Sequence, residues 1–187
     1  MSQPMTVPLV DASQAPLLAR PYYGGGDPGP IVGALAQVPE LLEVAMPFIG
    51  MALSPSAIPL RTKEIVILRT SGILECRYCV QSHTVAALDA GLSTEEVAAL
   101  GSPEPAAHHF EDAAERALVG WIDAVAGGRG AVPTELTAAM ERHFRDHEVV
   151  ELTAVVGVTM MLNRFCTTLG LPTSPEVLVR LAAVGLE

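Results

Sequence analysis

Apolar residues recur along most of this chain at the spacing of a helix, and no segment alternates apolar and polar residues over a useful length. An exposed strand needs that alternation, whereas a helix needs the wider period. Pro39 and Pro47 should divide the first helical segment into two short helices or one kinked helix. The sequence therefore predicts an all-α fold. The expected helical segments span residues 31–53, 60–74, 76–90, 93–100, 106–126, 133–144, 147–169 and 174–184.

Residues 1–30 differ in character, because prolines and the run Gly24–Gly26 interrupt any helix. We expect an irregular arm that lies over the body of the protein or over a neighbouring subunit. The glycine run is not a phosphate-binding loop, since no Gly-Lys-Ser/Thr follows it and no strand precedes it. Residues 31–187 are predicted to form a single domain.

This domain contains a weak internal sequence repeat. Residues 60–92 begin with Arg-Thr-Lys-Glu-Ile-Val-Ile-Leu, and residues of about 145–172 begin with Arg-Asp-His-Glu-Val-Val-Glu-Leu. The second segment keeps the helical pattern but lacks the thiols Cys76 and Cys79, and Asn163 stands opposite the latter. A duplicated helical unit with a degenerate second half is one interpretation, and chance similarity between two apolar helices is the other. Asn163 is then a candidate for a bond across the repeat or an interface.

The composition excludes several classes of function. Half of the 187 residues are hydrophobic, 4% are aromatic and 17% are charged, so the core must be mostly aliphatic. The net charge is −10, and Lys63 is the one lysine, which leaves no basic patch for nucleic acid or for an anionic membrane. The mean hydropathy of +0.38 is high for a soluble protein and predicts helices buried on more than one face, hence a homo-oligomer.

The cysteines and the apolar runs indicate the compartment. Cys76, Cys79 and Cys166 are too few for a disulfide scaffold, and the N-terminus lacks the basic and apolar regions of a signal peptide. The strongest apolar run, residues 152–162, is shorter than the roughly 20 residues that span a membrane. We therefore expect a cytoplasmic protein that is not membrane-bound, in which the close cysteine pair is catalytic or metal-binding and Cys166 is a buried, small hydrophobic residue.

Four residues are the candidate catalytic residues: Glu64, Cys76, Cys79 and His83. In a helix, the steps of three and seven residues from Cys76 place both thiols and the imidazole on one face. A preceding antiparallel helix could bring the Glu64 carboxylate to the same place. The alternative for Glu64 is an ion pair with an arginine of its own helix, at position 61 or 69.

These residue types suffice for dithiol redox catalysis. The thiolate is the reactive form of cysteine, and the first turn of a helix favours it. A histidine can take the thiol proton, and a carboxylate can orient that histidine. One cysteine can then attack a peroxide, while the other resolves the sulfenic acid to a disulfide that an external dithiol reduces.

The pattern Glu-x11-Cys-x2-Cys-x3-His resembles the core motif of the alkyl hydroperoxidase D family, within the carboxymuconolactone decarboxylase-like superfamily. The flanking runs Leu-Arg-Thr-Ser, before the cysteines, and Ala-Ala-Leu-Asp-Ala-Gly-Leu, after the histidine, fit as well. Leu-Asn-Arg-Phe at 162–165 and Leu-Gly-Leu-Pro at 169–172 are similar to the second half of longer members. The close match covers about residues 60–92, with looser similarity to about residue 172.

The resemblance implies an all-α bundle that assembles into dimers, trimers or hexamers, with the site near a subunit interface. It implies that Cys79 attacks the peroxide, that Cys76 resolves it, and that Glu64 and His83 relay protons. The leading prediction is therefore a peroxidase that reduces hydrogen peroxide or small organic hydroperoxides without metal, haem or flavin. Its reductant would be a dithiol, and a lipoyl-bearing protein is one candidate. Tyr78 departs from members with a histidine there, and we interpret it as a pocket wall or packing residue, with proton transfer as the alternative.

Three other interpretations remain open. The scaffold could perform lactone decarboxylation or a related biosynthetic step, with His83 and Glu64 as acid and base. It could be a non-enzymatic oligomer whose cysteine pair senses oxidation. The two close cysteines and His83 could also bind zinc, with Glu64, His143 or His147 as the fourth ligand.

Overall fold

The computed structural model describes residues 4–186, and every regular element in that range is helical. This confirms the predicted all-α fold. Two short 3₁₀ helices, Arg20–Tyr23 and Ala107–His109, accompany the α-helices. The α-helices are α1 (Pro30–Leu35), α2 (Pro39–Leu53), α3 (Leu60–Ile73), α4 (Arg77–Asp89), α5 (Thr94–Leu100), α6 (Ala113–Gly127), α7 (Thr134–His143), α8 (Asp146–Leu169) and α9 (Pro175–Ala183).

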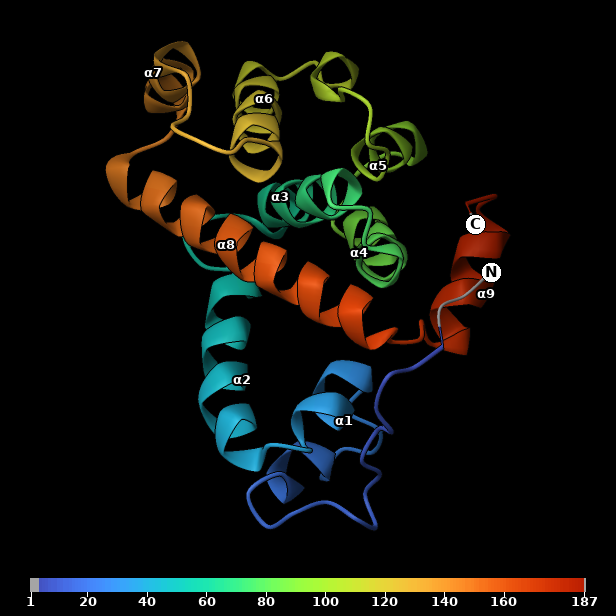
Figure 1. Ribbon diagram of the computed structural model, residues 1–187. Coiled ribbons are helices and arrows are strands. Elements are labelled where there is room, and N and C mark those ends of the chain that lie inside the picture. Colours follow the sequence, from blue (N-terminus) through green and yellow to red (C-terminus); the bar gives the residue numbers. More distant parts are fainter. Residues whose placement is uncertain (1–3, 187) are drawn as a thin grey trace.

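Helix α3 forms the centre of the molecule (Figure 1). It packs against α4, α6 and α8, and its residues from Lys63 to Gly72 are all buried. Gly72 is required by a close approach, because a Cβ there would lie 2.3 Å from the carbonyl oxygen of Leu100. The helix that carries Glu64 is therefore enclosed on several sides and held rigidly.

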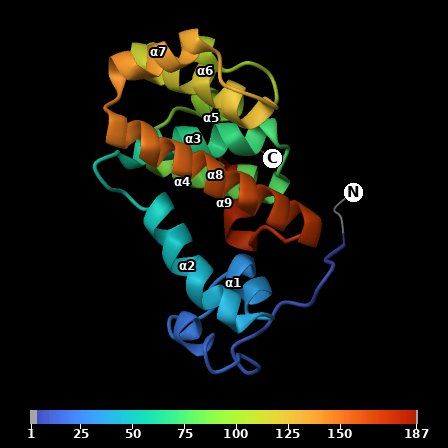
Figure 2. The same ribbon diagram turned by 60° about the vertical axis from the view of Figure 1, so that its left-hand side comes forward.

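Helix α8 crosses the molecule between two groups of elements. Helices α3 to α7 lie on one side of it, whereas α1, α2 and the N-terminal residues lie on the other (Figures 1 and 2). Among residues 4–186, it is the helix long and apolar enough to cross a membrane by length and composition, and 44% of the relevant window is buried in the protein. Because α8 packs along α3, it has the position of a core helix.

Residues 4–29, in the N-terminal arm, are irregular apart from one 3₁₀ turn. The Thr6 backbone N–H donates to the Leu169 carbonyl oxygen at 3.0 Å, and that of Val10 donates to the Gly33 carbonyl at 3.0 Å. The arm thus lies over the end of α8 and over α1, on its own chain.

Several predicted helix ends are confirmed and two are wrong. The α5 capping box between Ser93 and Glu96 is present. Helix α6 begins at Ala113 rather than at residue 106, because the Asp112 carboxylate accepts the first free backbone N–H groups of the helix and Ala106 has no such side chain. Helix α8 begins at Asp146 rather than at residue 147, and Arg145 is its N-cap, since the Glu148 side chain reaches back to the Arg145 backbone N–H.

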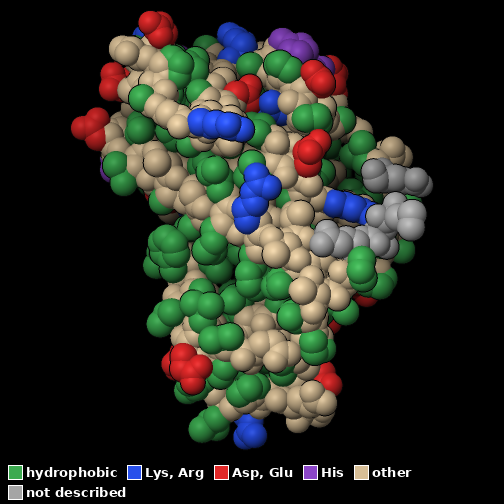
Figure 3. Space-filling model, in the orientation of Figure 1, with side chains coloured by type: hydrophobic (Ala, Val, Ile, Leu, Met, Phe, Trp, Pro, Cys, Tyr) green, Lys and Arg blue, Asp and Glu red, His purple; other side chains and the backbone are tan. Residues whose placement is uncertain are grey.

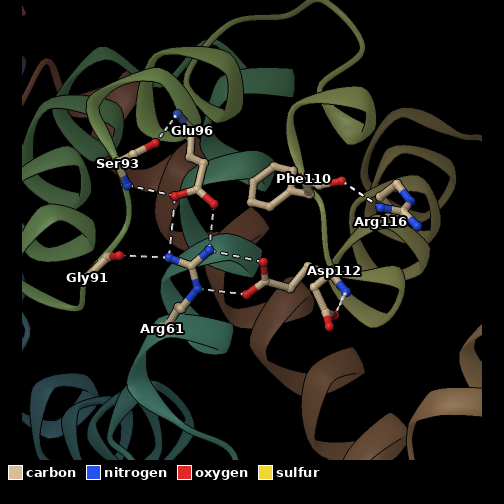
Figure 4. Close-up of polar contacts among 8 residues, drawn as sticks. Arg61, Gly91, Ser93, Glu96, Phe110, Asp112 and Arg116 are labelled. Carbon is tan, nitrogen blue, oxygen red and sulfur yellow. Dashed lines mark hydrogen bonds and ion pairs between the residues drawn. The ribbon is translucent and has the colours of Figure 1, made fainter.

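An arginine joins three helices on the side of the core away from α8. Figure 4 shows Arg61, from α3, between two carboxylates. Its guanidinium donates to Glu96 at 2.6 Å and to Glu115 at 2.7 Å, and it also reaches the carbonyl oxygen of Gly91 at 2.8 Å. This network ties α3 to the start of α5 and of α6.

Lys63 follows Arg61 by two residues in α3 and is fully buried. Its ammonium donates to the Ala52 carbonyl at 2.9 Å and to the Ser54 carbonyl, and it pairs with Glu151 at 2.7 Å. The contacts with Lys63 and Ser56 hold the pKa of the Glu151 carboxyl below its usual value. The only lysine is thus a structural cation that joins α2, α3 and α8.

Candidate active site

The cysteine pair is created by a tight turn between α3 and α4. Helix α3 ends at Ile73, and Glu75 adopts a left-handed backbone conformation, with φ of 52°. This conformation is uncommon for a residue with a Cβ and makes the chain reverse sharply. The Cys76 backbone N–H donates to the Ser71 carbonyl at 3.0 Å. As a result, Cys76 becomes the N-cap of α4.

The structure pairs Cys76 with Cys79 as a disulfide, with their Cα atoms 5.3 Å apart. The Cys79 backbone N–H donates to Cys76 Sγ at 3.4 Å, so the N-cap sulfur serves the helix as a capping acceptor. The two residues are 0% and 4% exposed, respectively. Both sulfurs therefore lie in the first turn of α4, where unpaired N–H groups favour a thiolate.

Glu64 and His83 form a second pair beside the cysteines. Glu64 Oε2 lies 2.9 Å from His83 Nδ1, and the carboxylate is the more buried of the two groups. The ion pair of Glu64 with an arginine of α3, considered above, does not form, because Arg61 pairs with Glu96 and Glu115, and Arg69 pairs with Asp123. His83 follows Cys79 by one turn of α4, so the structure brings the four predicted residues to one region.

A cavity of about 510 Å³ opens beside the disulfide, at the N-terminal end of α4 and the C-terminal end of α8. Cys76 lines it, whereas Cys79 does not. Tyr78 also lines it, in agreement with its interpretation as a pocket wall. Burial, and secondarily the nearby Cys166, raise the pKa of Tyr78, while contact with the Ser82 hydroxyl acts in the opposite direction. The lining residues are Met5, Glu75, Cys76, Arg77, Tyr78, Cys166, Thr167, Gly170, Leu171, Pro172, Thr173 and Leu178.

Cys166 packs in one apolar cluster with Cys76 and Cys79. It is a free, buried thiol, and burial raises its pKa to about 12. It therefore stays protonated at neutral pH. The sequence placed Cys166 in the core, but it gave no signal that this thiol would face the same cavity as Cys76.

A buried polar bridge supports the cysteine turn from α8. Asn163 Nδ2 donates to Ser71 Oγ at 3.0 Å, and the Ser71 hydroxyl donates to the Ile67 carbonyl at 2.8 Å. Ser71 is also the residue whose carbonyl receives the Cys76 backbone N–H. Asn163 thus joins the two segments of the internal sequence repeat. Its predicted bond across the repeat is observed, while its partner could not be named from the sequence.

The histidines considered as further zinc ligands lie elsewhere. His143 ends α7 and His147 belongs to α8, at the opposite end of α8 from Asn163 and Cys166. Among residues 4–186, no three or more His, Cys, Asp or Glu side chains gather in a group suited to a metal ion.

Comparison with known proteins identifies the class. Residues 39–124 match the model of the carboxymuconolactone decarboxylase family. No curated protein sequence matches the chain. A candidate AhpD antioxidant defence protein from Agrobacterium tumefaciens is similar in structure, with a TM-score of 0.65 and 26% identity over 75% of this chain and 95% of that one. The family match and this AhpD-like structure support an alkyl hydroperoxidase D-like member of the carboxymuconolactone decarboxylase-like superfamily.

Two other solved structures share the fold over nearly the whole chain. The AhpD core of a peroxidase-related protein from Ralstonia eutropha JMP134 has a TM-score of 0.79 and 16% identity, over 95% of this chain and 97% of that one. A cysteine-to-alanine variant of the debrominase Bmp8, in complex with 2,3,4-tribromopyrrole, has a TM-score of 0.80 and 17% identity, over 98% and 100%. At these identities the likeness shows the fold, on which more than one activity is known.

Proposed function

We propose that this protein is a thiol-dependent peroxidase that reduces hydrogen peroxide or small organic hydroperoxides. The observation that carries the proposal is the Cys76–Cys79 pair in the first turn of α4, one helical turn from a buried carboxylate–histidine pair. The names of the AhpD-like structures support it.

The oxidative half of the cycle uses both thiols. The Cys79 thiolate attacks one peroxide oxygen, the O–O bond breaks, and water or an alcohol leaves after protonation. Cys79 is then a sulfenic acid, and the Cys76 thiolate attacks its sulfur to form the disulfide and release water. Cys79 is assigned the attack because it lies in the first turn of α4, where the helix N-terminus favours a thiolate, and because family members use the matching thiol.

The Glu64–His83 pair supplies and removes the protons. The carboxylate holds His83 by its Nδ1 atom, which leaves the other ring nitrogen free to take the Cys79 proton and return it to the leaving oxygen. Glu64 acts through His83 and is a positioning residue in this scheme.

The disulfide must be reduced by an external dithiol, and a lipoyl-bearing protein is one candidate. We also propose that the protein is cytoplasmic, where such reductants are available.

A homo-oligomer is proposed from the apolar outer face of α2. Its exposed residues recur at helical spacing, and apolar side chains cover this region of the surface in Figure 3. The outer side of α8 adds Val150 and Met161. A second copy of the chain would cover these side chains. The α2 residues are Leu41, Val44, Phe48 and Met51.

Reductive dehalogenation is a second candidate. A cavity of about 510 Å³ is far larger than a small peroxide needs, and the similar Bmp8 structure contains a brominated pyrrole. A thiolate could take a halogen from carbon while a proton replaces it, and the second thiol would then displace halide to give the same disulfide. The acid–base interpretation differs, because its turnover would survive removal of both thiols.

A trapping experiment tests the peroxidase. In Cys76→Ser, one equivalent of hydrogen peroxide should leave a sulfenic acid on Cys79 that dimedone labels, since the resolving thiol is gone and the nearby Cys166 stays protonated. Cys79→Ser should give no adduct at Cys76. Absence of the Cys79 adduct, or turnover of peroxide by a variant without either thiol, would contradict the proposal.

A further inference from the structure

A second cavity, of about 320 Å³, lies between α4, α5 and α9. Among the described residues, it shares no lining residue with the cavity beside the disulfide, and neither Cys76 nor Cys79 lines it. Its volume is in the range of sites that hold small molecules. The peroxidase scheme leaves this cavity without a role.

The wall of the second cavity is apolar and uncharged. Val80, Val97, Leu181 and Leu186 line it, and none of its described lining residues carries a charge. A charged ligand would lose its water of hydration there without gaining a counter-ion, so the wall favours an uncharged one. The net charge of −10 on the chain disfavours an anion further.

Gln81 separates the two cavities. It follows Cys79 by two residues in α4 and is only 9% exposed. The hydroxyl of Thr173, which lines the first cavity, donates to Gln81 Oε1 at 2.7 Å, whereas Gln81 itself lines the second. Its amide oxygen is therefore occupied, while its Nε2 atom, with two N–H donors, has no partner within residues 4–186.

Thr84 adds a second donor to the same wall. It lies three residues after Gln81 on one face of α4, is 6% exposed, and its hydroxyl has no partner in the part of the chain that the structure describes. The fully enclosed side-chain atoms that lack a partner there are Thr70 Oγ1 and Asn163 Oδ1. The Gln81 and Thr84 donors are thus not sealed off, and the cavity that they line gives access to them. A buried donor without a partner is costly, and a ligand that accepts from it removes that cost.

We propose that the second cavity binds a small, uncharged carbonyl compound, such as a ketone or an ester with an apolar body. A carbonyl oxygen has two lone pairs, so one oxygen can accept from both Gln81 Nε2 and the Thr84 hydroxyl. The apolar body then packs against Val97 and Leu181. Binding is non-covalent and uses neither thiol of the disulfide, so this site is separate from the proposed peroxidase.

Three probes of similar shape test the class of ligand on the full chain: acetophenone, toluene and benzoate. They share a phenyl ring and differ in the group beside it, which is a neutral carbonyl, a methyl group or a carboxylate. In ligand-observed NMR titrations, acetophenone should bind at least about fivefold more tightly than either of the others. Failure of acetophenone to bind, or equal binding of benzoate, would overturn the proposal.

The two donors are tested by removing them singly. Gln81→Leu and Thr84→Val should each weaken acetophenone binding roughly three- to tenfold, as expected for one neutral hydrogen bond, and change toluene binding less than about twofold. Thr173→Val is the matched control, because it breaks the same contact with Gln81 Oε1 but keeps the Gln81 Nε2 donor. It should leave acetophenone binding unchanged. If Thr173→Val and Gln81→Leu weaken binding alike, Gln81 is not the donor and the proposal fails.

Filling each cavity tests where the probe binds. Ala98 is an exposed lining residue of the second cavity, and Thr94 is an exposed residue of the same helix that does not line it. Ala98→Trp should weaken acetophenone binding at least about tenfold, whereas Thr94→Trp should not. Leu178→Trp, which fills the first cavity, should also have no effect. Loss of binding in Leu178→Trp alone would place acetophenone beside the disulfide and overturn the proposal. No peroxide is used, so these results are independent of whether the protein is a peroxidase.

Discussion

Helices α3 and α8 begin with the same Arg-x-x-Glu pattern, yet they perform different tasks. Helix α3 stops at Ile73, and the left-handed residue Glu75 starts a new helix at the thiols. Helix α8 continues without a break past Asn163, which aligns with Cys79 in the internal repeat, and ends only at Leu169, with Gly170 as its C-cap. The comparison teaches that the position of the cysteine pair depends on the turn before it. The turn places sulfur at a helix N-terminus, and a continuous helix offers no such position.

The first residues of the two helices differ in the same way. Arg61 holds two carboxylates of α5 and α6, whereas Arg145 is the N-cap of α8. Glu64 reaches His83 on another helix, but Glu148 bonds to the backbone of its own helix. Equivalent positions therefore make contacts with other helices in one segment and cap the helix in the other.

The thiols should show the largest difference between the segments. Cys79→Ser removes the attacking sulfur and should lower peroxide consumption at least about a hundredfold without unfolding the protein. Cys166→Ala, in α8, removes a protonated thiol and should change the rate by less than about twofold. Both rates are measured with the same saturating reductant. A large loss of activity in Cys166→Ala would make α8 a second reactive segment and contradict the comparison.

The equivalent glutamates should differ next. Glu64→Gln weakens the hold on His83 and should lower the rate about tenfold or more, with an altered pH–rate profile. Glu148→Gln disturbs only the cap of α8 and should cost about 0.5–1 kcal/mol of unfolding free energy at unchanged activity. Stopped-flow oxidation and urea unfolding separate the two effects. Similar kinetics in both variants would show that Glu64 is structural.

The hydrogen bond between Asn163 and Ser71 should have a smaller effect, and this effect is on the free energy of unfolding. Asn163→Ala leaves the buried Ser71 hydroxyl without its donor and should cost about 1–2 kcal/mol in urea unfolding. Met161→Ala, at an exposed position two residues earlier, is the control and should cost less than about 0.5 kcal/mol. Equal costs would mean that the Asn163–Ser71 contact contributes nothing.

The smallest effect concerns acid stability. Burial raises the pKa of the Glu96 carboxyl, but its bonds to Arg61 and Ser93 outweigh this and leave the pKa below its usual value of 4.5. A folded-state pKa below the unfolded one stabilises the protein above that value, and the contribution disappears as pH falls through the folded pKa. Arg61→Gln should therefore flatten part of the loss of unfolding free energy below about pH 4.5, whereas Arg145→Gln should not. Unfolding curves of the two variants at several acidic pH values test this difference.

Much of the fold followed from local patterns. Helical periodicity and the Gly and Pro breaks gave the all-α class and most helix ends, and the spacing of Cys76, Cys79 and His83 placed them at the start of one helix. The start of α6 was predicted too early, because the apolar pattern begins before Asp112. A periodic pattern does not show which side chain caps the helix.

The rest of the site depends on contacts between distant segments. The cavity is closed by Met5, the end of α8 and Leu178 of α9, which meet only after the chain folds. The contact of Asn163 with Ser71 spans two helices that no local pattern pairs. The left-handed turn at Glu75 also escapes prediction, because glutamate has no preference for that conformation.

The most direct test of the central claim is intact mass with thiol counting, before and after one equivalent of hydrogen peroxide under metal-free conditions. A working pair predicts a loss of about two mass units within seconds, mapped by trypsin to a link between Cys76 and Cys79, with Cys166 still free. Thiols that stay unreacted, or a link that includes Cys166, would contradict the account.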